Sequence, residues 1–183
     1  MVYVYHGSKI SGLSKINPFK SGYNKKYVYA VSDPAFAVIF INRQGGSLVA
    51  SWGRLKDGKP YFCEKIKGVF NSNYKNQNGS LYILDKSYFL RKKGFWNEEF
   101  ISSKEVPVIK EVKINDLEEY LLELEKKGKF KFIPYEKRLD YFPEIDGNIM
   151  KDIKKLEEKY SKEKVLYFVK KYRPDIIEKL SDI

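Results

Sequence analysis

Cysteine and histidine are almost absent from this chain of 183 residues, which contains only Cys63 and His6. A single cysteine cannot form an internal disulfide, and one cysteine with one histidine does not supply the ligands of a zinc or Fe–S cluster. A His-rich metal site or a Ser-His-Asp triad would have to be built around His6. We therefore expect a protein without a metal, in which Cys63 is a small buried apolar residue.

Long apolar runs and an N-terminal leader are also missing. The apolar stretches, such as Ala35–Ile41, are far shorter than the roughly 20 residues that a membrane span requires. Strand-like residues begin at Val2 with no basic and apolar segment before them, so no secretory signal is visible. These absences predict a cytoplasmic protein with no membrane partner. The hydrophobic content of 43% predicts a packed core rather than disorder.

Arginine is scarce in a chain that is otherwise basic. Residues 1–100 carry 16 Lys/Arg against 6 Asp/Glu and residues 101–183 carry 19 against 18, so the first part holds almost all of the net charge of +11. A basic face attracts anions. Only five of the 35 basic residues are arginines, however, and base readout and bidentate phosphate contacts favour arginine. A basic nucleic-acid-binding domain is therefore an alternative and not the leading hypothesis.

The hydrophobic pattern changes its period along the chain, which predicts an α+β fold. A polar cap followed by proline at Ser32-Asp33-Pro34 predicts a helix that runs to about Asn42. After residue 114 the pattern is helical, with a helix capped by Asn115 and ending near Lys127, and further helices from Asn148 broken near Ser161 and at Arg173–Pro174. Short strands separated by turns are expected before that point, at 2–5 (with a turn at Gly7–Ser8), 27–31, 47–52, 60–65, 68–70, 80–85, 99–102 and 106–114. We predict a strand-rich core at 1–114 and a helical extension at 115–183 packed on it.

The residues that suggest chemistry stand on or next to separate predicted strands and on the helix that follows one of them. His6 follows the first strand and is next to a glycine, beside which a ligand can approach the backbone. Tyr29 lies on the next strand, Phe40 lies 11 residues later on the helix, and Glu99 opens another strand. Aromatic faces can stack on a positively charged ring, and a carboxylate can stabilise an oxocarbenium-like charge on a sugar. These residue types suit a cationic heterocycle attached to a ribose.

Three short motifs in this order resemble those of the ADP-ribosyltransferase fold, in its His-Tyr-Glu class: Tyr5-His6-Gly7-Ser8, Tyr29-Ala30-Val31-Ser32-Asp33 with Ala37 and Phe40, and Asn97-Glu98-Glu99-Phe100-Ile101. The resemblance covers about residues 1–114 and implies a core of two small packed sheets. It also implies that NAD is the substrate, with Ser8 among the residues of the NAD-binding motif. By position, His6 would hold a ribose and Gly7 the nicotinamide amide, while Tyr29 and Phe40 would enclose the nicotinamide ring. Glu99 would be the catalytic carboxylate.

Two positions depart from the pattern of that family. Phe40 stands where a tyrosine is usual, which keeps the stacking surface but removes a hydroxyl contact. Asn97 stands where arginine-modifying members carry a second glutamate, which disfavours arginine as the acceptor. Glu98 is an alternative to Glu99, because neighbouring residues on a strand point to opposite faces. The sequence Phe100-Ile101 that follows Glu99 fits the family pattern better.

The leading hypothesis is therefore an NAD-dependent ADP-ribosyltransferase that breaks the bond between nicotinamide and ribose. The acceptor of ADP-ribose would be a protein, a nucleic acid or water, and the sequence does not choose among them. A second hypothesis is a non-catalytic module of the same fold that binds a nucleotide or a partner. Fold resemblance alone does not separate the two.

Overall fold

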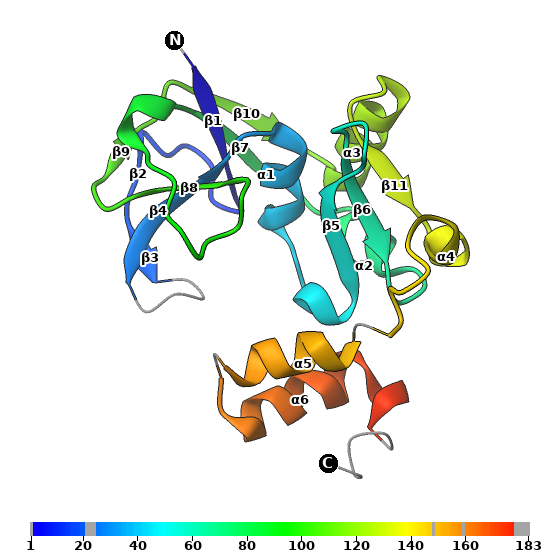
Figure 1. The fold of residues 1–183 in the computed structure, drawn as a ribbon. Coiled ribbons are helices and arrows are strands. Elements are labelled where there is room, and N and C mark those ends of the chain that lie inside the picture. The colour runs from blue at the N-terminus through cyan, green and yellow to red at the C-terminus, as the bar shows by residue number, and fades with distance from the viewer. Residues whose placement is uncertain (1, 21–24, 148, 159, 178–183) are drawn as a thin grey trace. The chain divides into compact units, whose positions relative to one another are not determined.

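A computed structural model describes residues 2–20, 25–147, 149–158 and 160–177 (Figure 1). The chain forms two compact units, each built from separate stretches of sequence. Unit 1 comprises Met1–Arg43 and Asn73–Phe130, and unit 2 comprises Gln44–Ser72 and Lys131–Ile183. In the described ranges, no helix combines the length and the apolar character that crossing a membrane requires.

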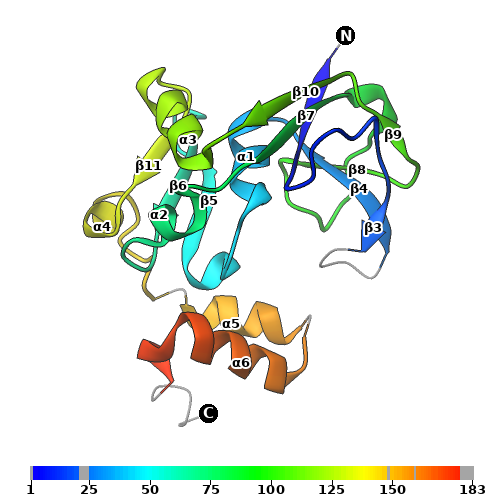
Figure 2. The ribbon, with the colours of Figure 1, turned by 180° about the vertical axis from the view of Figure 1, so that it is seen from behind.

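Unit 1 contains the larger sheet. Strands β10, β7, β1 and β4 are neighbours in that order, and β3 and β8 also pair with β4, which gives six strands in the described residues (Figure 2). All of these pairs are antiparallel. The elements of unit 1 are β1 (Tyr3–Ser8), β2 (Lys15–Ile16), β3 (Phe19–Lys20), β4 (Lys26–Val31), α1 (Pro34–Ile41), β7 (Gly79–Asp85), a 3-10 helix (Lys86–Tyr88), β8 (Glu99–Ser102), β9 (Val106–Pro107), β10 (Lys110–Ile114) and α3 (Leu117–Lys126).

One face of this sheet carries a hydrophobic core cluster of unit 1. The two-stranded sheet of β2 and β9 contributes Ile16 and Val106 to that core. The six-stranded sheet contributes side chains that alternate along its strands, as the two-residue period of a strand requires. These are Val4, Val28, Ala30, Tyr82, Leu84 and Phe100.

The other face is covered in part by α1. The side chain of Asp33 caps this helix by accepting a hydrogen bond from the backbone N–H of Ala35 (3.0 Å), as the Ser-Asp-Pro sequence predicts. The helix contacts β1 and β7 at two glycines. A Cβ atom on Gly7 would lie 2.0 Å from the carbonyl oxygen of Ala37, and one on Gly79 would lie 2.7 Å from the side chain of Ile41. The absence of these two side chains is therefore what allows α1 to lie on the sheet.

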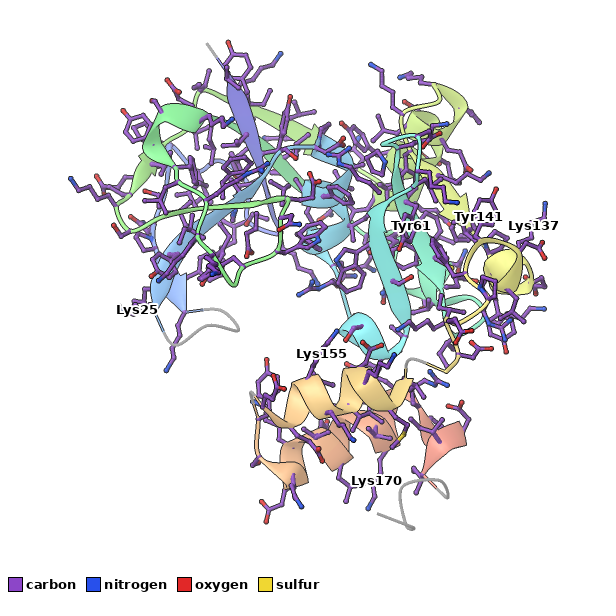
Figure 3. The ribbon with its side chains drawn as sticks, in the orientation of Figure 1. Lys25, Tyr61, Lys137, Tyr141, Lys155 and Lys170 are labelled. Carbon is purple, nitrogen blue, oxygen red and sulfur yellow. The ribbon has the colours of Figure 1, made fainter. Side chains whose placement is uncertain are left out.

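Unit 2 consists of a three-stranded sheet and several helices, and Figure 3 shows its side chains, with Tyr61 labelled on β6. The buried carboxylate of Glu64 accepts backbone hydrogen bonds from Gly68, Phe70 and Tyr135 at 2.8–3.2 Å. Lys65 forms an ion pair with Asp152 (2.5 Å). The elements are a 3-10 helix (Gly46–Leu48), β5 (Ala50–Arg54), β6 (Pro60–Glu64), α2 (Val69–Tyr74, which crosses the boundary with unit 1), β11 (Lys131–Ile133), a 3-10 helix (Tyr135–Lys137), α4 (Arg138–Tyr141), α5 (Ile149–Glu157), α6 (Lys162–Tyr172) and a 3-10 helix (Pro174–Ile176).

The α+β class predicted from the sequence is confirmed, as are the strand at 99–102 and the burial of Cys63. Several local predictions were wrong. Gly7 and Ser8 do not form a turn, because they pair with Leu81 and Ser80 inside β1. The segment 68–70 begins α2 instead of forming a strand, and Asp116 rather than Asn115 caps α3. The predicted strand at 47–52 starts instead in a 3-10 helix, and β5 begins only at Ala50. The predicted strand at 106–114 is split into β9 and β10, and Asn148 lies outside the described residues.

The compact units also follow boundaries other than the expected division at residue 114. Helix α3, which begins after that point, belongs to unit 1, where its first residue, Leu117, donates a backbone hydrogen bond to Gln77 (2.8 Å). Strand β11 belongs to unit 2, because it pairs in parallel with β6. Residues 115–183 are therefore shared between the two units. The expected pair of packed small sheets stays a prediction, and the described residues form sheets of six, three and two strands.

We predict that Gly7→Ala destabilises the protein much more than Gly147→Ala. The new methyl group at position 7 would overlap the Ala37 carbonyl, whereas at position 147 the nearest atom lies 3.7 Å away. Overpacking of this kind costs on the order of 2 kcal/mol or more. Urea denaturation of both variants measures the difference, and equal midpoints would contradict the close approach of α1 to β1.

Candidate functional site

The candidate site lies where two strands of the large sheet separate. Strand β1 pairs with β7 over six consecutive residues but with β4 only at Tyr5↔Val31. Val31 also pairs with Glu99 of β8, so β1 and β8 lie on opposite edges of β4. Beyond this pair the backbones of β1 and β4 no longer form a ladder. The next residue of β1 is His6, and its side chain takes the place of the missing backbone pairing.

His6 and Tyr29 are joined by a hydrogen bond. The Nδ1 atom of His6 lies 2.6 Å from the backbone carbonyl oxygen of Tyr29. A carbonyl can only accept, so Nδ1 carries a proton and donates it, and in the neutral ring Nε2 bears the lone pair. Burial lowers the pKa of His6, and the bond to Tyr29 opposes this in part. The ring is therefore neutral near pH 7, and its Nε2 atom can accept a hydrogen bond from a hydroxyl group.

Tyr29 and Glu99 share one face of the sheet. Register pairs Tyr29 with Ile101 and Val31 with Glu99, so the side chains of Tyr29 and Glu99 are diagonal neighbours on adjacent strands. The two side chains also interact electrostatically. Burial raises the pKa of Tyr29, and the negative charge of Glu99 raises this pKa further. The structure thus links Tyr29 to His6 through its backbone carbonyl and to Glu99 through their shared face. The side chain of His6 alternates with Gly7, which faces α1, and its ring lies 6.4 Å from that of Tyr82, its partner on β7.

The two adjacent glutamates have different surroundings. Glu98 lies at the end of the strand pair, where its carboxylate accepts a hydrogen bond from the hydroxyl of Ser32 and its backbone carbonyl accepts one from the Ser32 N–H (3.3 Å). The alternation of a strand directs Glu98 to the face opposite Tyr29. Glu99 is the glutamate on the face of Tyr29. This geometry favours Glu99 over Glu98 as the functional carboxylate.

Gly7 and Ser8 continue β1 after His6. The space beside the Cα atom of Gly7 is filled by α1, so the packing of the helix by itself requires glycine at this position. The hydroxyl of Ser8 accepts a hydrogen bond from the backbone N–H of Ile10 (3.0 Å), which turns the chain out of the strand. The structure therefore gives both residues a local structural role beside the NAD-binding role that the resemblance implies.

Phe40 lies on α1, which covers the same face of the sheet that carries Tyr29 and Glu99. It is partly exposed, whereas the other residues from Ala35 to Ile41 are buried. Its ring contacts that of Trp96 (centroids 5.5 Å apart), and the guanidinium carbon of Arg43 lies 4.7 Å from its centroid. The backbone carbonyl of Trp96 accepts a hydrogen bond from the backbone N–H of Glu99 (2.9 Å). Phe40 therefore supports the turn that begins β8.

The loop after Ser8 is fastened to the sheet beside His6. Tyr82, which is paired with His6 across β1 and β7, donates its hydroxyl proton to the carbonyl of Ile10 (2.8 Å) and accepts from the N–H of Leu13 (3.2 Å). The carboxylate of Glu111 accepts from the N–H of Gly12 (3.0 Å). These bonds hold residues 10–13 at Tyr82, whose ring centroid lies 6.4 Å from that of His6.

Sequence reasoning missed an aromatic cluster around these residues. The Phe19 ring contacts those of His6 (6.2 Å) and Tyr29 (5.3 Å), and Tyr27 contacts Tyr29 (6.1 Å) and Phe95 (6.0 Å). The alternation Tyr27-Val28-Tyr29 signals that both tyrosines share a face. Phe19 gives no comparable signal, because β3 has only two residues and its contact with His6 depends on the fold.

Comparison with known proteins assigns no family. No family model matches the chain, and neither a curated protein nor a solved structure matches it. Within the described ranges, no three His, Cys, Asp or Glu side chains are grouped so as to hold a metal ion. The function is therefore inferred from the geometry of His6, Tyr29 and Glu99.

The state of His6 predicts a pH dependence of stability. Since folding lowers the pKa of His6, the unfolded chain takes up a proton first as the pH falls below 6.5, and the free energy of unfolding decreases. We expect His6→Asn, which can donate to the Tyr29 carbonyl but does not titrate, to lack this component. Urea midpoints at pH 7.5 and 5.5 test this, and equal pH dependence in both proteins would contradict it.

Proposed function

We propose that the protein is an NAD-dependent ADP-ribosyltransferase whose site is formed by His6, Tyr29 and Glu99. The observation that carries the proposal is that residues separated by up to 93 positions lie around Tyr29 where β1 separates from β4: His6 donates to its backbone carbonyl, and Glu99 shares the face of its side chain. It is supported by their order and strand contexts, which resemble the His-Tyr-Glu class. A cytoplasmic location is part of the proposal.

The residues suit the chemical groups of NAD. The Nε2 atom of neutral His6 is an acceptor for a ribose hydroxyl. The aromatic surface of Tyr29, and Phe40 on the same side of the sheet, suit a flat cationic ring such as nicotinamide. The carboxylate of Glu99 suits a hydroxyl of the ribose attached to that ring. These side chains come from three strands and one helix, so their positions are set by the scaffold rather than by a loop.

The proposed reaction breaks the bond between C1′ of the ribose and the nicotinamide nitrogen. Nicotinamide leaves with the electron pair and becomes neutral, the acceptor forms a new bond to C1′, and the acceptor releases a proton to water. Positive charge develops on the ribose in the transition state, as in glycoside hydrolysis. Glu99 would stabilise that charge, and His6 would hold the other ribose in place.

We predict that NAD raises the melting temperature of the wild-type protein and has much less effect on His6→Ala. A ligand at about 100 times its dissociation constant contributes roughly 2.7 kcal/mol, which is several degrees for a chain of this size. Tyr3→Ala, at an exposed position of the same strand, is the control and should keep the shift. An absence of any shift in the wild type would overturn the proposal.

We also predict that Glu99→Gln lowers the rate of nicotinamide release by about 100-fold to 1,000-fold while NAD binding is largely retained. Glu98→Gln is the matched control, because its amide oxygen can still accept from Ser32 and it should release nicotinamide at nearly the wild-type rate. Chromatographic measurement of nicotinamide gives the rates. A loss confined to Glu98→Gln would show that the carboxylate assignment is wrong. NAD binding without release in the wild type would favour the non-catalytic binding module.

A further inference from the structure

A strongly basic segment connects β7 to β8 and ends at the candidate site. Residues 86–95 contain four cations and no acidic residue. We call the exposed cationic and large apolar residues of this segment the basic strip, and they are Lys86, Tyr88, Leu90, Arg91, Lys92 and Lys93. The strip therefore presents a concentrated positive charge on unit 1.

Three of the four cations of the strip, Lys86, Arg91 and Lys92, lie over aromatic rings. The Nζ atom of Lys86 and the guanidinium carbon of Arg91 lie 5.1 and 4.7 Å from the centroid of the Phe100 ring. No salt bridge within the described stretches of the chain includes any of the four cations. Their charge is therefore available to an anionic partner.

Large apolar side chains are exposed between these cations. Tyr88 is 49% exposed and Leu90 is 59% exposed, and the Phe19 ring beside His6 and Tyr29 is 44% exposed. Surfaces that combine a positive path with exposed aromatic rings are typical of proteins that bind single-stranded nucleic acid, because the cations contact phosphates and the rings stack on bases. The scarcity of arginine disfavours base-specific readout but not this sequence-tolerant binding.

The strip leads directly to Glu99. The Nζ atom of Lys92 lies 5.8 Å from the ring centroid of Tyr27 and 5.6 Å from that of Phe95. The backbone of the same segment continues through a turn in which Phe95 donates to the Lys92 carbonyl (3.2 Å) and Glu99 donates to that of Trp96 (2.9 Å). A polyanion bound along the strip would therefore end beside the aromatic cluster and the carboxylate.

We propose that the basic strip binds single-stranded nucleic acid and that this nucleic acid is the acceptor of ADP-ribose. The second part depends on the proposed function, whereas binding does not. In the transfer, a nitrogen or oxygen atom of the nucleic acid forms the bond to C1′ of the ribose as the bond to nicotinamide breaks. Its proton goes to water and nicotinamide leaves with the electron pair.

The experiment measures binding of a fluorescently labelled 12-nucleotide thymidine oligonucleotide to the full chain without NAD. The logarithm of the association constant should fall with the logarithm of salt concentration with a slope of about −0.7 per phosphate contacted. Replacing Lys92 and Lys93 together by glutamine should weaken binding and make the slope less steep by about 1.4. Tyr88→Ala should weaken it by about fivefold or more through lost stacking.

A matched control replaces Lys155 and Lys170, which lie exposed on α5 and α6 and are labelled in Figure 3, by glutamine. This variant has the same net charge as the strip variant and should bind like the wild type. Equal weakening in the two variants would overturn the proposal, because it would show that binding depends only on net charge. Tighter binding of a polyglutamate peptide or of anionic vesicles than of the oligonucleotide would overturn it as well.

A second measurement separates this proposal from the proposed function. Radiolabel from the adenylate part of NAD should appear on the oligonucleotide with the wild-type protein and not with Glu99→Gln. Nicotinamide release without oligonucleotide binding would overturn the strip proposal and leave the proposed function standing. Oligonucleotide binding without NAD binding would support the strip as a binding surface and overturn both the proposed function and the acceptor role.

Discussion

The close contact between α1 and β1 at Gly7 is the constraint on which the rest of unit 1 depends. The Cα atom of Gly7 faces the carbonyl of Ala37, and a methyl group would not fit between them. With the helix on β1 and β7, the part of the same sheet face formed by β4 and β8 carries Tyr29 and Glu99. The helix also brings Phe40 against Trp96, next to the turn that begins β8. One glycine therefore has a role in packing and, through it, a role in shaping the candidate site.

The separation of β1 from β4 gives His6 its chemical character. A backbone pair at this point would have satisfied the Tyr29 carbonyl, and instead the imidazole donates to it. That bond defines the tautomer, and burial keeps the ring neutral, so the available atom is an acceptor. At the other edge of β4, the carboxylate of Glu98 accepts a hydrogen bond from the Ser32 hydroxyl. The side chain of Glu99 lies on the same face of the sheet as that of Tyr29. The difference between the two glutamates is thus a consequence of strand alternation.

The sequence was sufficient to predict the elements with strong local signals. The Asp33 cap, the strand at Glu99 and the buried Cys63 each follow from residue types within a few positions. The strand through Gly7 and Ser8 was missed, because glycine and serine favour turns locally and only their pairing with β7 makes them a strand. Helix α3 was predicted at nearly the right place, but its membership of unit 1 depends on tertiary contacts such as Leu117 with Gln77.

The candidate site, like the fold, could be predicted only in part from local sequence patterns. His6, Tyr29 and Glu99 could be chosen from short motifs, yet their proximity follows from the order of strands β1, β4 and β8, which no local pattern determines. Phe19 was missed for this reason, since it acquires meaning only through the rings that it contacts. The structure also changes what the scarcity of arginine implies about nucleic-acid binding. Taken over the whole chain it disfavours nucleic-acid binding, but four cations gathered in ten residues next to exposed aromatic rings form a local surface whose affinity for phosphates does not require base-specific contacts.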